Sequence, residues 1–222
     1  MDGQVLGELG PFKLKIPNWN TAVAAIRNDL ETYPSLKILA AQYGNVYKGA
    51  RGLMVVDVVA SRQRRYDSYV VPKILPLYKS KAKDLSLLSL SSKSPKWLPL
   101  RVGEAETMKN LAQVLLHYGQ SKGLKDEEKI VATWANDENA FQRTLDIKGI
   151  GPALLQYLRM RCGADSLKVD VRVIDELSKL GIPVHWFTPE GLLELCTEMA
   201  REASCTLLEL DQALWHRNSL SK

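Results

Sequence analysis

Two glycines separated by a single residue lie in the segment Lys148-Gly149-Ile150-Gly151-Pro152, whose residue types are well suited to binding chemistry. Neither glycine has a Cβ atom, so the backbone can turn tightly there. Pro152 suits the first position of a helix, where no amide donor is needed. The turn is therefore predicted to end at a helix N-terminus, whose open N–H groups could bind a phosphate.

A helix, this Gly-x-Gly turn and a second helix together form a helix-hairpin-helix. Such a hairpin would contact DNA through backbone amides, and it would therefore not read the base sequence. The backbone carbonyls facing the other way, those of Leu145, Ile147 and Ile150, could hold a monovalent cation. An ordinary tight connection between two helices would use the same glycines, so the residues alone leave both interpretations open.

A lone acid, Asp170, follows nineteen residues after Gly151, in Val169-Asp170-Val171. It stands at the head of another predicted helix, where an aspartate side chain can cap the first turn. It could also be the carboxylate of a functional site. The two roles are compatible, because capping would fix the orientation of the carboxylate.

A basic segment, Ser61-Arg62-Gln63-Arg64-Arg65-Tyr66, stands at the end of a predicted helix. These residues are candidates for contact with phosphates. An ordinary solvated helix terminus is the alternative, since positive charge there suits the helix dipole. Lys93, Lys96 and Arg101 flank a serine-rich stretch and are further candidates for phosphate contacts.

Helical periodicity dominates the chain and predicts an all-α fold of about ten helices. Residues 66–78 are interrupted by Pro72 and Pro76, which predicts a kinked or split helix. Residues 84–99 are predicted to be a long loop, and residues 12–16 alternate weakly like a short strand. The predicted helices are 19–31 (capped by Asn18), 51–65, 66–78, 104–118 (ended by Gly119), 126–134, 138–145, 152–161, 171–180 (ended by Gly181), 189–203 and 206–217.

Composition sets limits on the class of protein. The 222 residues are 45% apolar, enough for a substantial core, and a net charge of +5 with a pI of about 9.0 fits an anionic partner without requiring one. The three cysteines, Cys162, Cys196 and Cys205, are too few and too dispersed for a four-cysteine iron–sulfur or zinc site. We expect no disulfides between these cysteines, and therefore a reduced, intracellular compartment. No apolar run approaches membrane-spanning length, and the start lacks the pattern of a signal peptide.

The stretch from Leu145 to Val173, with its Gly-Ile-Gly-Pro turn and its aspartate, resembles the signature of the HhH-GPD superfamily of DNA glycosylases. A second stretch, Val58-Val-Ala-Ser-Arg-Gln63, resembles the early helix of that family, whose glutamine or its neighbour inserts into DNA. The resemblance implies two helical lobes with a cleft between them. One lobe would comprise residues 1–48 and 170–222, and the other residues 49–169, with the hairpin at about 138–162.

The resemblance also implies a function, that of a DNA N-glycosylase of base excision repair. Asp170 would face the cleft as the catalytic carboxylate, where it could stabilise a sugar with oxocarbenium character or orient the attacking water. DNA would contact the hairpin, at Lys148, Gly149, Ile150 and Gly151, and the basic segment, at Arg62, Gln63 and Arg64. Arg62 or Gln63 would fill the gap left by a flipped base.

One departure from the family concerns a lysine that its bifunctional members carry two residues after the second hairpin glycine. This chain has Ala153 there, which predicts a monofunctional glycosylase in which water attacks the sugar. Lys148 or Lys168 could act as a displaced nucleophile in a glycosylase with lyase activity. The third alternative is a DNA-binding module without catalysis.

The base pocket is predicted at Tyr157, one turn from Ala153, and at Trp215 of the C-terminal helix, which also carries Asp211 and often borders the pocket in relatives. Packing in the core is the alternative for both aromatic residues. The bulky candidate pocket favours a damaged purine as the substrate. We expect a monomer acting on double-stranded DNA, with no cofactor and no iron–sulfur cluster.

Overall fold

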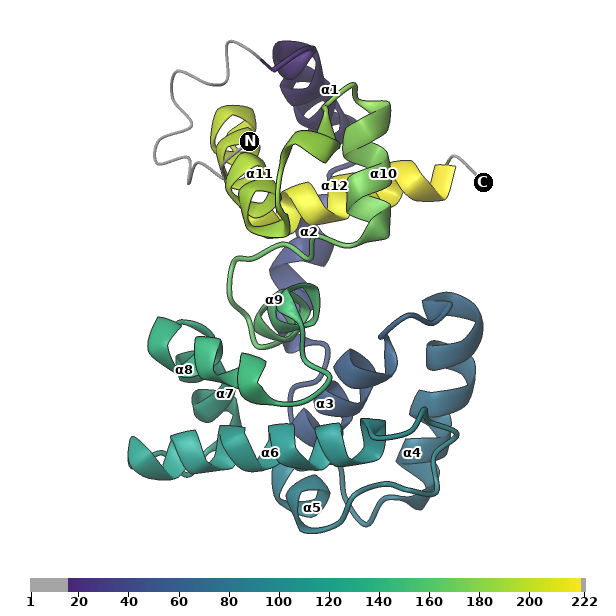
Figure 1. Ribbon diagram of the computed structural model, residues 1–222, viewed down its shortest axis with the longest axis vertical. Coiled ribbons are helices and arrows are strands. Elements are labelled where there is room, and N and C mark those ends of the chain that lie inside the picture. The colour runs from purple at the N-terminus through teal and green to yellow at the C-terminus, as the bar shows by residue number, and fades with distance from the viewer. Residues whose placement is uncertain (1–15, 221–222) are drawn as a thin grey trace. The chain divides into compact units, whose positions relative to one another are not determined.

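A computed structural model describes residues 16–220, whose regular elements are all helices, with no strand among them (Figure 1). The predicted all-α class is confirmed, and the alternating segment 12–16 lies outside the described residues except for Ile16. Two compact units make up the chain. The central unit is Tyr43–Ala164, and the terminal unit combines the chain up to Gln42 with the chain from Asp165 onward. These divisions fall a few residues before the predicted ones.

The central unit is organised around α3 (Arg51–Ala60), whose ten residues are all buried. Figure 1 shows this helix between α6 and α9, and it also contacts α4 and α5. Gly52 permits the close contact with the segment before α5, because a Cβ atom there would lie 2.2 Å from the carbonyl oxygen of Ser86. The other elements are η2 (Tyr43–Asn45), η3 (Tyr66–Ile74), α4 (Leu75–Lys81), α5 (Leu87–Ser92), α6 (Glu104–Ser121), α7 (Glu127–Ala135), α8 (Glu138–Gln142), η4 (Arg143–Asp146) and α9 (Pro152–Arg161).

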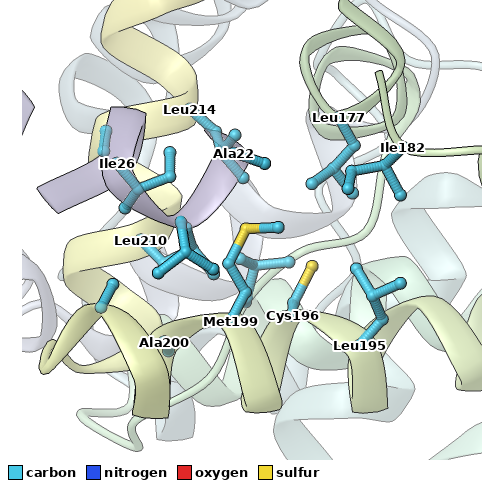
Figure 2. Packing of buried hydrophobic residues seen from close by; sticks show 14 of the residues in the cluster. Ala22, Ile26, Leu177, Ile182, Leu195, Cys196, Met199, Ala200, Leu210 and Leu214 are labelled. Carbon is cyan, nitrogen blue, oxygen red and sulfur yellow. The ribbon is translucent and has the colours of Figure 1, made fainter. Parts of the chain in front are cut away.

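The terminal unit is built from both ends of the chain. Its elements are α1 (Trp19–Thr32), α2 (Ser35–Gln42), α10 (Val171–Lys179), η5 (Val184–Trp186), α11 (Pro189–Ala203) and α12 (Leu207–Leu220). Helix α12 contacts each of the other four α-helices. Figure 2 shows the shared core, in which Ala22 and Ile26 of α1 pack with Leu177, Met199 and Leu210 from the later helices.

Several predicted elements are confirmed. Helix α9 begins at Pro152 and ends at Arg161 as predicted, and α10 begins directly after Asp170. The segment with two prolines is split, into the π-helical η3, which contains Pro72, and α4, which has Pro76 in its first turn.

Other predictions were wrong for reasons of packing. The predicted loop 84–99 contains α5, which Ser86 caps and which the Glu127 carboxylate stabilises by accepting the N–H groups of Leu87 and Leu88. Helix α2 was not predicted at all. Gly119 does not end α6; it lies inside the helix, where the absence of a Cβ atom lets Ile130 of α7 pack against it.

Two helix ends also differ from prediction. Helix α3 ends at Ala60, so Arg62, Gln63 and Arg64 follow the helix in a turn instead of forming its last turn. Asn18 adopts a left-handed conformation with φ 59° and makes no side-chain cap for α1. Its side chain lies instead against Gly181, where a Cβ atom would come within 2.3 Å of the Asn18 amide nitrogen.

Candidate functional site

The predicted hairpin is present as a tight turn between η4 and α9. The N–H of Ile147 donates to the Thr144 carbonyl at 3.1 Å, and the N–H of Ile150 donates to the Ile147 carbonyl at 3.0 Å. Gly149 has φ +97°, a left-handed conformation that favours glycine. Gly151 has φ −109° and ψ 174°, an extended conformation that any residue can adopt.

The two glycines therefore have different reasons to lack a side chain. A Cβ atom on Gly149 would lie 2.6 Å from Nη1 of Arg62 and 3.2 Å from the hydroxyl of Thr107. A Cβ atom on Gly151 would meet nothing within 4 Å. Contacts inside the protein explain why residue 149 is a glycine. Gly151 instead leaves open space beside the N-terminus of α9.

Two backbone donors of the hairpin are open. Within residues 16–220, the N–H groups of Gly149 and Gly151 make no hydrogen bond to other protein groups. Pro152, at the first helical position, has no N–H to satisfy. The start of α9 can therefore accept an anion such as a phosphate oxygen.

The carbonyl side of the hairpin is held by the protein. The Thr107 hydroxyl lies 2.8 Å from the Lys148 carbonyl oxygen, and Nη1 of Arg62 donates to the Gly149 carbonyl at 3.3 Å. The Lys148 side chain itself is exposed. Arg62 was predicted to contact DNA, and its guanidinium also supports the hairpin from inside the central unit.

Glu104, at the start of α6, is the buried centre of this support. Its fully buried carboxylate accepts two hydrogen bonds from the Arg64 guanidinium, at 3.0 and 2.6 Å, and one from the backbone N–H of Arg101 at 2.9 Å. Nη2 of Arg62 lies 3.6 Å from the same carboxylate. No local pattern in the sequence indicates the role of Glu104, because only the fold brings the segment 61–65 to the start of α6.

Gln63 is the exposed tip of the turn after α3. It has φ 52°, an uncommon backbone conformation for a residue other than glycine. The Arg101 guanidinium donates to the Gln63 side-chain oxygen at 2.7 Å and to its backbone carbonyl at 2.8 Å. Arg101, a candidate phosphate contact from the sequence, thus stabilises the conformation of Gln63.

Asp170, in the terminal unit, caps α10. Its Oδ1 accepts from the N–H groups of Arg172 at 3.0 Å and Val173 at 3.3 Å. Its Oδ2 lies 3.3 Å from Nζ of Lys168, and 22% of the side chain is exposed. The cap uses Oδ1 alone and leaves Oδ2 to face the Lys168 ammonium, so capping and a chemical role are compatible.

A second acid, Asp211 of α12, lies near Asp170. Only 2% of Asp211 is exposed, and burial followed by the negative charge of Asp170 raises its pKa to about 7. The sequence named this residue only through the resemblance, since nothing in the local pattern of α12 indicates that its carboxyl group is buried.

The two predicted pocket aromatics have different surroundings. Tyr157 is buried in the central unit, where its hydroxyl donates to Oδ2 of Asp57 at 2.8 Å and accepts from Nη2 of Arg161 at 2.9 Å. Burial, with the charge of Asp57, raises the Tyr157 pKa well above its ordinary value, so the hydroxyl remains a donor. Trp215 is half-buried in the terminal unit, with the Arg172 guanidinium 3.9 Å from its ring centroid.

Residues 16–220 contain neither a metal-binding cluster nor a membrane-spanning helix. No group of three His, Cys, Asp or Glu side chains there could hold a metal ion, and no described helix is long and apolar enough to cross a membrane. A hollow of about 500 Å³ in the central unit is lined in part by Tyr78, Lys81, Lys83, Lys93 and Trp97. Of the residues that the sequence offered as candidates, it contains Lys93 and none of the hairpin, base-pocket or acid residues.

Among solved structures, the chain is similar to the crystal structure of the Methanocaldococcus jannaschii 8-oxoguanine DNA glycosylase, with a TM-score of 0.53. The match covers 90% of this chain and 94% of that chain, at 17% sequence identity. This chain has the fold of a DNA glycosylase. The likeness confirms the predicted glycosylase-type helical fold, and at this identity it carries the fold alone.

Comparison of the sequence alone finds no relative. No protein-family model matches the chain, and no curated protein matches it by sequence.

Proposed function

We propose that this protein is a DNA N-glycosylase of base excision repair. The carrying observation is the open N-terminus of α9, where the N–H groups of Gly149 and Gly151 make no bond within the described chain and Gly151 leaves space for a ligand. A duplex phosphate fits this arrangement, because backbone amides bind it without reading sequence. The glycosylase fold and an acid at the head of α10 support the same function.

Asp170 is the proposed catalytic residue. Water attacks C1′ of the sugar, the C1′–N bond breaks, and the base leaves with the bonding electrons and takes up a proton. The carboxylate stabilises the positive charge that develops on the sugar and orients the water, as in glycoside hydrolysis. The backbone N–H groups of Arg172 and Val173 hold Oδ1 in place, so the carboxylate is preorganised.

The proposed reaction is monofunctional. Ala153 offers no nucleophile at the start of α9, and Lys168 forms an ion pair with Asp170. An ammonium group in an ion pair has no lone pair for attack on the sugar. Lys148 is exposed on the hairpin, which suits contact with a phosphate.

Gln63 is the proposed residue that fills the gap left by the extruded base. It is exposed, and Arg101 holds both its side chain and its backbone, so little conformational freedom would be lost on insertion. Arg62 supports the hairpin beside it. We propose a damaged purine as the substrate class, and an oxidised purine is the first lesion to test, because the structurally similar protein is named for 8-oxoguanine.

A monovalent cation at the carbonyl side of the hairpin remains part of the proposal. The Ile147 carbonyl already accepts the Ile150 N–H, but a carbonyl oxygen has a second lone pair, so the donor set of Leu145, Ile147 and Ile150 fits such an ion. The bound ion would supply positive charge near the phosphate contact.

The test is an excision assay on duplexes that each hold one lesion: 8-oxoguanine, hypoxanthine, alkyladenine, uracil, or thymine opposite guanine. Products are resolved with and without hot alkali for the wild type, Asp170→Asn and the control Asp175→Asn, which removes an exposed acid from the same helix. Asparagine keeps an acceptor for the α10 cap, so the first variant should fold.

Strand breaks that require alkali and disappear only in Asp170→Asn are the expected result. Strand breaks without alkali would show lyase activity and overturn the proposal that the glycosylase is monofunctional. Intact DNA binding with no product on any duplex would favour a non-catalytic DNA-binding module.

A further inference from the structure

We propose that Asp211 is a positioning residue for Asp170: it holds the backbone segment that carries Asp170 and adds a second, buried carboxyl group to its surroundings. The inference rests on the proposed function, because it takes Asp170 as the catalytic carboxylate. No motif marks Asp211, and it is too buried to touch a substrate.

Lys168 connects the two acids. Its backbone N–H donates to the Asp211 carboxyl group, and its Nζ lies 3.3 Å from Oδ2 of Asp170. Nε2 of Gln212 lies 3.2 Å from Oδ2 of Asp211. One side chain on α12 therefore fixes the residue whose amine faces the proposed catalytic carboxylate.

The second oxygen of Asp211 is the unusual feature. Its Oδ1 is buried and makes no hydrogen bond among the described residues. A buried carboxylate oxygen without a donor is costly, whereas a protonated carboxyl group has no net charge to solvate. The site therefore favours the protonated form of Asp211.

The electrostatic surroundings agree. Burial and then the charge of Asp170 raise the Asp211 pKa to about 7, while the Lys168 amide, the Lys168 charge and Gln212 act in the opposite direction. From α11, Cys196 faces the same region, since the charge of Asp211 helps to raise the pKa of its thiol. Protonation of Asp211 thus changes near neutral pH.

Several other charged groups on the helices around α12 have partners of their own. Arg217 pairs with Asp29 of α1, Glu176 of α10 pairs with Lys179 and Asn218, and Arg172 lies over the Trp215 ring. On α2, Lys37 acts on Cys205. Asp170 and Lys168 are therefore the charges that couple most directly to Asp211.

The protonation state of Asp211 has a consequence for Asp170. With Asp211 neutral, the Lys168 ammonium faces a single carboxylate, and the segment 168–170 stays in place. Ionisation of Asp211 puts a second negative charge beside Lys168 and leaves Oδ1 as an unpaired anionic oxygen. If only the protonated form keeps Asp170 in position, the excision rate falls about tenfold between pH 6 and pH 8.

The first measurement is the single-turnover excision rate between pH 5.5 and pH 8.5 on the best duplex. The excision rate of the wild type and of the Asp175→Asn control should fall about tenfold between pH 6 and pH 8. The rate of Asp211→Asn, a neutral isostere, should show no such fall. Asp211→Ala removes the acceptor for the Lys168 N–H, so its rate should be low at every pH. The same fall in Asp211→Asn as in the wild type would overturn the inference.

The second measurement, urea unfolding against pH, needs no activity. The folded-state pKa of Asp211 lies above the ordinary value, about 3.9, expected in the unfolded chain. Its ionisation therefore weakens the fold progressively from about pH 4 to about pH 7, and fully above that. The urea midpoint of Asp211→Asn should exceed that of the wild type by an amount that grows across this range. The same substitution should have a smaller effect on the midpoint when Asp170→Asn is also present.

The two proposals fail in different ways. A wild type that excises no lesion would overturn the proposed function. A midpoint difference between Asp211→Asn and the wild type that does not change with pH would overturn the inference about Asp211, whether or not excision occurs.

Discussion

Tyr157, a predicted pocket residue, has a structural role inside the central unit. Its position on α9, one turn from Ala153, is suited to a base-stacking role, but its hydroxyl lies between Asp57 and Arg161 inside the central unit. The Arg161 guanidinium is also stacked over Tyr43, with 4.0 Å to the ring centroid. The tyrosine helps to satisfy a buried ion pair, in which Nε of Arg161 lies 3.4 Å from Oδ2 of Asp57.

We predict that Tyr157→Phe lowers the free energy of unfolding by about 1–3 kcal/mol, because Asp57 and Arg161 each lose a buried hydrogen bond. The excision rate per folded molecule should stay within about twofold of the wild type. Urea unfolding and single-turnover kinetics measure the two quantities. Tyr69→Phe is the control, since its exposed hydroxyl makes only a 3.4 Å contact with the Pro99 carbonyl. A loss of excision without a loss of stability would instead support the predicted place of Tyr157 in the base pocket.

At the scale of elements, the hairpin depends on contacts from two separate segments, α6 and the turn after α3. Thr107 of α6 contacts the Lys148 carbonyl, and Arg62 of the turn after α3 contacts the Gly149 carbonyl. Glu104 holds that turn through Arg64 and the N–H of Arg101. The contacts of Thr107 and Arg62 both go to backbone carbonyls of the hairpin. The N–H groups of Gly149 and Gly151 are left open by the rest of the described chain.

The two hairpin glycines give a matched pair of variants. Gly149→Ala should lower the free energy of unfolding by about 1–2 kcal/mol, because alanine is strained at φ +97° and its Cβ would crowd Arg62. Gly151→Ala should change stability by less than about 0.5 kcal/mol, since its Cβ meets nothing in the protein.

Gly151→Ala should nevertheless weaken binding to a fluorescent duplex by about tenfold, because its methyl group would stand where the phosphate approaches. Fluorescence anisotropy at constant salt measures this, with urea unfolding as the check on folding. Unchanged affinity in Gly151→Ala would show that the start of α9 is not the phosphate contact.

At the scale of the whole molecule, the two units differ in how the chain builds them. The central unit is one continuous segment, Tyr43–Ala164, with its own buried helix α3. The core of the terminal unit combines α1 and α2 with α10, α11 and α12, so it needs both ends of the chain (Figure 2).

We predict that the isolated segment 43–164 folds on its own, with helical circular dichroism and a cooperative urea transition. It should bind duplex DNA in a salt-dependent manner through the hairpin, and it should excise no base because it lacks Asp170. The segment 165–222 alone should show no cooperative transition. A non-cooperative central segment would mean that its core depends on the terminal unit.

Local signals determined much of this protein in advance. Pro152 after Gly151 predicts the first residue of α9, and Asp170 predicts the start of α10, because caps and helix-starting prolines act within one turn of chain. The same local pattern placed the phosphate-binding candidate and the acid. Apolar periodicity was sufficient for the all-α class.

Only the tertiary structure decided which groups are buried and what they contact. Glu104 meets Arg64, Glu127 supports the start of α5, and Asp211 lies beside the Asp170 segment, each through residues distant in sequence. Gly119 and Gly151 are the same residue type, yet one admits Ile130 and the other leaves open space. Burial and long-range contact depend on how helices pack, and the spacing of residues along one helix does not contain that information.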